Sequence, residues 1–115
     1  GKVAVDLGFG GMADEAEEGR RIAETLGNKP ILIMGNHGVS VAAETVAEAF
    51  DHLYYFERAA GTLLTAYATG QPLAVMSDNL AAKTAAEWEP YKGMGHAHFD
   101  YLKRQLDKNQ PDYLD

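Results

Sequence analysis

The chain has 115 residues, no cysteine and a formal net charge of −7, so disulfide frameworks and thiolate chemistry are excluded and nucleic acids and anionic membranes are disfavoured as partners. Apolar residues make up 46% of the sequence, which is typical of one globular domain with a modest core. No apolar stretch reaches membrane-spanning length and no signal peptide is visible, and we expect a cytoplasmic protein.

Strand-like sequence begins almost at once, over Lys2–Leu7. Val3, Val5 and Leu7 alternate with polar or small residues, which predicts a strand that is polar on one side. The glycine-rich stretch Gly8–Gly11 ends this strand and lacks the third glycine of the GxGxxG pattern, so we interpret it as a connection rather than a nucleotide-binding loop. Because the chain opens at Gly1, without a methionine and directly before this strand, we interpret its start either as a cut inside a larger domain or as a trimmed terminus.

A first helix is predicted from Asp14, as the N-cap, to Leu26, and Gly27-Asn28 is a helix stop. Acidic residues fill its first turn, where they match the helix dipole. We interpret them as a solvated helix start rather than a metal site.

The stretch that follows carries the main candidate site residue. Ile31–Met34 is a short apolar run typical of a buried strand, and Val39–Val41 alternates as a second strand. The polar tetrapeptide Gly35–Gly38 between them places the imidazole of His37 at the end of a rigid sheet. This position suits a metal ligand because strands fix geometry better than mobile loops do. An ordinary turn with an incidental histidine is the alternative.

The longest predicted helix covers Thr45–Thr69, with a capping box formed by Thr45 and Glu48 and a stop at Gly70 and Pro72. Glu57 interrupts its apolar stripe, which indicates either a helix face that meets solvent or a neighbouring subunit at that turn, or a structural salt bridge. We expect Glu57 to be at least partly buried with a hydrogen-bonding partner, either within this chain or across a subunit contact. The stripe consists of Val46, Phe50, Leu53, Ala60, Leu64 and Tyr67.

Two further helices are predicted after a short connection. The first is capped by Ser77 or Asp78 and ends before Pro90, whereas the second follows Gly93 and Gly95. The pair His96-Ala97-His98 falls at the start of this last helix, where residues two apart point to nearly opposite sides, so we do not expect it to hold one ion. Asn109–Asp115 is predicted to be a frayed polar tail.

The segment Lys29–Gly70 resembles the C-terminal half of the class II aldolase/adducin domain. The order of its motifs carries the resemblance: an apolar strand, Asn36-His37-Gly38, Val39-Ser40-Val41, Ala49-Phe50, and then Tyr55–Ala60. The resemblance implies a three-layer α/β/α sandwich with a mostly antiparallel sheet, truncated at its N-terminal side, of which residues 1–115 form the C-terminal portion of a single domain.

In the enzymes of this family, zinc is held by a His-x-His pair and by the histidine of the Asn-His-Gly motif, which corresponds to His37. The resemblance therefore implies a zinc-dependent lyase, with another divalent metal as an option, that acts on a hydroxy-carbonyl, sugar-phosphate-like substrate through a metal-stabilised enediolate. It also implies a homotetramer. The other metal ligands and the acid/base residue are then expected in the part of the domain that precedes residue 1. The fragment alone is expected to be inactive. An adducin-like assembly or interaction domain without catalysis is the alternative from another class.

Overall fold

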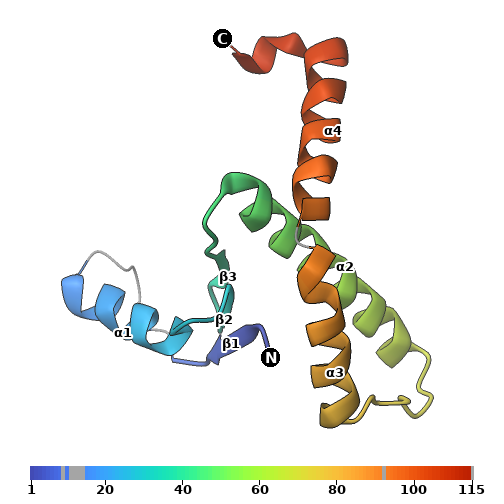
Figure 1. The fold of residues 1–115 in the computed structure, drawn as a ribbon. Coiled ribbons are helices and arrows are strands. Elements are labelled where there is room, and N and C mark those ends of the chain that lie inside the picture. The colour runs from blue at the N-terminus through green and yellow to red at the C-terminus, as the bar shows by residue number, and fades with distance from the viewer. Residues whose placement is uncertain (9, 11–14, 92, 115) are drawn as a thin grey trace. The chain divides into compact units, whose positions relative to one another are not determined.

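Figure 1 shows the fold, a computed structural model that describes residues 1–8, 10, 15–91 and 93–114. The chain divides into two compact units, Gly1–Leu53 and Tyr54–Asp115, which are described separately below. Helix α2 begins in the first unit and ends in the second.

The first unit contains a three-stranded sheet in the order β1-β2-β3. Strands β1 (Val3–Asp6) and β2 (Ile31–Met34) are parallel, with Asp6 opposite Met34, because a helical crossover joins them. Strand β3 (Gly38–Val41) returns antiparallel to β2 through a tight turn. All three predicted strands are confirmed. The sheet that they form is mixed, and the mostly antiparallel sandwich remains a prediction.

Helix α1 (Ala16–Leu26) is the crossover and packs against β1 and β2. Its predicted end is confirmed: Gly27 adopts a φ of 58° and its amide donates to the carbonyl of Ala23 at 2.9 Å. The helix starts with Glu15 at the N-cap position, and the proposed cap Asp14 lies outside the described residues.

The core of this unit is small and consists of buried residues of the sheet together with Ala47 of α2. Leu32 is fully buried at the centre of β2, with Ala4 and Ile31 beside it. The prediction for the faces of β1 is wrong, because Ala4 and Asp6 point inward whereas Val5 is 56% exposed. The contacts that allow Asp6 to be buried are described with the site.

Helix α2 (Val46–Ala68) has the predicted capping box. The amide of Glu48 donates to the Thr45 hydroxyl at 3.2 Å, and the amide of Thr45 donates to the Glu48 carboxylate at 3.2 Å. The helix ends before Gly70, whose φ is 67°. Its apolar stripe is not buried in this chain, since Leu64 is 70% and Tyr67 62% exposed.

The second unit continues with α3 (Asp78–Trp88), the 3₁₀ turn η1 (Glu89–Tyr91), α4 (Gly93–Asn109) and the 3₁₀ turn η2 (Pro111–Leu114). The Ser77 cap is confirmed, because its hydroxyl accepts the amide of Leu80 at 3.4 Å. Two predictions are wrong here. Gly93 and Gly95 lie inside α4 rather than before it, and the chain end forms η2, with the Tyr113 hydroxyl bonded to Asp107.

Within the described ranges, no helix combines the length and the apolar character that a membrane span requires.

Candidate functional site

His37 lies in the turn between β2 and β3, as the sequence predicts, and the residue is exposed. Its amide donates to the carbonyl of Met34 at 3.2 Å, which closes the turn. The backbone here needs unusual angles, with φ of 59° at Asn36 and 153° at Gly38. Asparagine and glycine adopt such angles more easily than other residues, which explains why these residue types flank the histidine.

The end of β1 lies directly against this turn. The amide of Gly35 donates to the carbonyl of Asp6 at 2.7 Å. A Cβ on Gly35 would lie 3.4 Å from the Cα of Leu7, so the two backbones are in close contact. The carboxyl ends of parallel strands are where α/β sheets commonly bind ligands, and β1 and β2 end together here.

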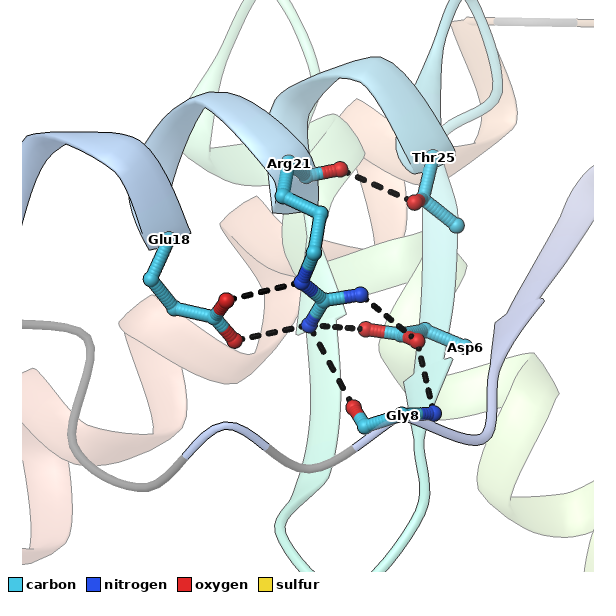
Figure 2. Close-up of polar contacts among 5 residues, drawn as sticks. All are labelled: Asp6, Gly8, Glu18, Arg21 and Thr25. Atoms are coloured by element: carbon cyan, nitrogen blue, oxygen red, sulfur yellow. Dashed lines mark hydrogen bonds and ion pairs between the residues drawn. The ribbon is translucent and has the colours of Figure 1, made fainter.

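A buried charge stands at the end of β1. Asp6 is 6% exposed, and its carboxylate is held by Arg21 of α1 through two bonds, from Nη1 to Oδ1 at 2.9 Å and from Nη2 to Oδ2 at 2.8 Å (Figure 2). The amide of Gly8 also donates to Oδ1 at 2.9 Å. The two-pronged guanidinium bond and the amide satisfy the carboxylate, which is why a charged residue can occupy the inner face of the strand.

Glu18 binds the same guanidinium from another side. Nε of Arg21 donates to its Oε2 and Nη2 to its Oε1, both at 2.7 Å (Figure 2). Nη2 also reaches the carbonyl of Gly8 at 3.3 Å. We call Asp6, Glu18 and Arg21 the arginine clamp. It combines one cation with two anions, so its guanidinium is already neutralised by protein groups.

Sequence reasoning missed the arginine clamp. It assigned Asp6 to the polar face of its strand and the acidic residues of the first turn of α1 to solvent. Glu18 is in fact partly buried against Arg21. The sequence did contain a hint of this contact: an aspartate in a short strand is followed by an arginine on the crossover helix, which places both residues close to the sheet. This hint does not specify that the two side chains pair.

Arg21 shifts the ionisation of both carboxyl groups. Its hydrogen bonds lower the pKa of Asp6 and the pKa of Glu18, and burial opposes both shifts only in part. The two carboxylates in turn raise the pKa of Arg21, with Glu18 the larger cause. A lowered carboxyl pKa stabilises the fold above the ordinary carboxyl range, and this stabilisation is lost as the pH falls through the lowered values.

We therefore expect Arg21→Met to lower the melting temperature of the full-length protein at neutral pH more than Arg20→Met does. Arg20 is an exposed neighbour on the same helix and makes none of these contacts. The difference between wild type and Arg21→Met should be constant above about pH 6 and shrink below about pH 5, where unfolded carboxyl groups begin to take up protons. Thermal unfolding followed by circular dichroism from pH 3 to pH 8 measures it. A difference that stays constant to about pH 3 would contradict the assigned ion pairs.

The other residues singled out from the sequence lie elsewhere. Glu57 is exposed on α2, so burial within this chain is wrong, and burial across a subunit contact stays a prediction. His96 and His98 both lie in α4 and are partly buried, and the ring of His98 packs edge-to-face on Tyr54 with 4.7 Å between centroids.

The described residues alone do not make up a complete metal site. Across the described part of the chain, no group of three or more histidine or acidic side chains has the arrangement of a metal site. The exposed imidazole of His37 fits the role of a single donor, and a catalytic zinc site takes three protein ligands. The rest of a site that includes His37 would have to come from protein groups beyond these.

Comparison with known proteins matches the region that contains both the turn and the arginine clamp. A model of the family described as "Class II Aldolase and Adducin N-terminal domain" matches residues 5–64. A Caulobacter vibrioides protein named "Putative aldolase class 2 protein" is 34% identical over 115 residues, which cover 93% of this chain and 42% of that protein. An adducin-related protein of Schizosaccharomyces pombe is 34% identical over 70 residues, which cover 61% of this chain and 21% of that protein. The chain thus spans about two fifths of the first relative and one fifth of the second.

Proposed function

Since this chain belongs to the class II aldolase/adducin family, we propose that it is the C-terminal part of a metal-dependent lyase that acts on a hydroxy-carbonyl, sugar-phosphate-like substrate. The observation that carries the proposal is the placement of His37. Its turn is fixed by short backbone bonds at the shared end of β1 and β2, and the residue is exposed to solvent. A ligand of a catalytic metal needs both a fixed backbone and an accessible imidazole.

In this proposal His37 is one of three protein ligands of a zinc ion, and the other ligands belong to the part of the protein upstream of residue 1. When bound, zinc acts as a Lewis acid that polarises a carbonyl oxygen and stabilises the negative charge left when a carbon–carbon bond breaks. His37 contributes a neutral imidazole, and the Asn36–Gly38 backbone sets the direction from which it approaches. Another divalent metal would use the same donor.

We also propose that the complete protein is a homotetramer. The support is the apolar surface that this chain leaves uncovered on α2, where Leu64 and Tyr67 are mostly exposed. Large exposed apolar patches on soluble proteins commonly mark interfaces. Glu57 lies on the same helix, in a shallow depression lined also by Arg58 and Thr62, and a neighbouring subunit is the partner that we propose for it.

A second candidate function is an adducin-like assembly domain that binds no metal. The likeness to an adducin-related protein over 70 residues supports it. The two candidates differ in the upstream sequence, because only the lyase requires a His-x-His strand there.

The lyase predicts a metal requirement that the assembly domain does not. The full-length protein should cleave a phosphorylated hydroxy-ketone, lose this activity on treatment with a strong chelator, and regain it with Zn²⁺ but not with Mg²⁺, which prefers oxygen ligands. Aldehyde release measures turnover, and a panel of sugar phosphates of different length serves as substrate. A folded protein that takes up no zinc and turns over no member of the panel would favour the assembly domain.

A further inference from the structure

We propose that Arg21 is a positioning residue for His37. In this proposal the arginine clamp (Asp6, Glu18 and Arg21) fixes the end of β1, and the end of β1 fixes the turn that carries the imidazole. The inference rests on the proposed function for the role of His37 as a metal ligand, but the mechanical link between the clamp and the turn stands on the geometry alone.

The first step is that Arg21 holds Asp6 in a geometry that another cation does not reproduce. Both Asp6 oxygens and both Glu18 oxygens receive bonds of 2.7 to 2.9 Å from one planar guanidinium. The Asp6 side chain is only 7% exposed, so solvent gives little help to its charge. Removal of one partner from such a pair leaves an uncompensated buried charge, which the strand end can relieve only by moving toward water.

The second step runs through the backbone from Asp6 to His37. The carbonyl of Asp6 accepts the amide of Gly35 at 2.7 Å, and Met34, the residue opposite Asp6 in the sheet, accepts the amide of His37 at 3.2 Å. Two hydrogen bonds therefore connect the residue that Arg21 holds to the residue that presents the imidazole. A shift of the end of β1 must move Gly35 or break its bond.

The clamp also contacts Gly8 and Gly10, two described residues that follow the end of β1. The amide of Gly8 donates to Asp6, the carbonyl of Gly8 accepts from Arg21, and a Cβ on Gly10 would lie 2.9 Å from Oε1 of Glu18. A glycine is needed at position 10 because this oxygen is itself held by Arg21 and has little freedom to move away. Gly8 and Gly10 thus both lie against the clamp.

A direct role for Arg21 in binding a substrate anion fits the geometry less well. Its Nε and Nη2 atoms are committed to Glu18, Asp6 and Gly8, and the clamp as a whole carries one more negative than positive charge. A phosphate would have to displace a carboxylate and approach a second one. The same contacts that disfavour an anion site are those that fix the strand end.

The test uses the full-length protein and four variants: Arg21→Met, Arg21→Lys, Arg20→Met and His37→Ala. Two quantities are measured for each variant. The affinity for Zn²⁺ alone is obtained by competition with a chromophoric chelator. Hydrogen exchange is followed by mass spectrometry over residues 31–41 and, as a reference in the other unit, over residues 78–88.

Arg21→Met should weaken zinc binding about 10- to 100-fold, the usual range for residues that orient a metal ligand. It should also speed exchange over residues 31–41 while residues 78–88 exchange as in wild type. Arg20→Met should leave both quantities unchanged. Arg21→Lys keeps the charge without the planar fork, and it should restore less than half of the lost affinity on a logarithmic scale.

The proposal would be overturned if Arg21→Met had the same zinc affinity and the same exchange rates as Arg20→Met. It would also be overturned if Arg21→Met sped up exchange equally in residues 31–41 and 78–88, because that result indicates general destabilisation. If Arg21→Met does not fold, the milder pair Glu18→Gln and Glu17→Gln decides in the same way, because Glu18 belongs to the clamp and Glu17 does not. Failure of the proposed function has a different signature. His37→Ala would then bind zinc as tightly as wild type, and the exchange over residues 31–41 alone would decide whether Arg21 fixes the turn.

Discussion

Replacing His37 with alanine in the full-length protein is expected to lower zinc affinity and lyase turnover by more than about 100-fold. Loss of a residue that only orients a metal ligand already lowers metal affinity or activity by up to about 100-fold. The fold should persist. His37 is exposed and its amide bond to Met34 does not involve the side chain. Zinc content by elemental analysis, turnover, and circular dichroism of the folded variant measure the three effects.

His52→Ala is the matched control for this prediction. His52 lies on α2 and is partly buried, outside the turn between β2 and β3. We expect His52→Ala to keep its zinc and its turnover. A folded His37→Ala protein with the zinc content of wild type would remove His37 from the proposed ligands.

The second large effect concerns the chain in isolation. Residues 1–115 produced alone are expected to self-associate and to bind a hydrophobic dye, because few of the described apolar residues are buried while large apolar side chains on α2 face solvent. A sheet of three short strands also leaves edges open to pairing with other chains. Light scattering and dye fluorescence, compared with those of the full-length protein, test this.

A substitution on α2 sharpens the comparison. Leu64→Lys should reduce association of the isolated chain, whereas Thr65→Lys, at an exposed polar position of the same helix, should have a smaller effect. In the full-length protein Leu64→Lys should instead weaken the oligomer, if that surface is the subunit contact. A compact and stable monomer of residues 1–115 would contradict the prediction.

Local signals in the sequence predicted the local structure well. The capping box of Thr45 and Glu48, the Ser77 cap and the stop at Gly27 each depend on residues within four positions of one another, and all three are confirmed. The turn at His37 is also a local feature. Asparagine and glycine are residue types that favour turns, and here Asn36 and Gly38 both adopt a positive φ.

Contacts between distant residues were not predicted. Asp6 and Arg21 are fifteen positions apart, and their pairing reverses the expected faces of β1. A period of two shows that a strand has two faces, but the buried face depends on which side finds partners. Here the small residue Ala4 and the paired Asp6 are buried, and Val5 is left exposed.

The apolar stripe of α2 shows a further limit of sequence reasoning. The spacing correctly predicts a helix with an apolar face, and α2 covers nearly all of the predicted range. The same spacing does not say what covers that face. In this chain the stripe is largely open at Leu64 and Tyr67, and the subunit contact that we propose for it involves groups beyond these 115 residues.

The most direct test of the central proposal, that His37 is a ligand of a catalytic metal, is anomalous X-ray diffraction at the zinc edge from crystals of the zinc-loaded, full-length protein. We expect an anomalous peak about 2.0–2.1 Å from an imidazole nitrogen of His37, with the remaining protein ligands of the zinc ion supplied from outside residues 1–115. A zinc peak at another place in the protein, with the His37 ring turned to solvent, would contradict it.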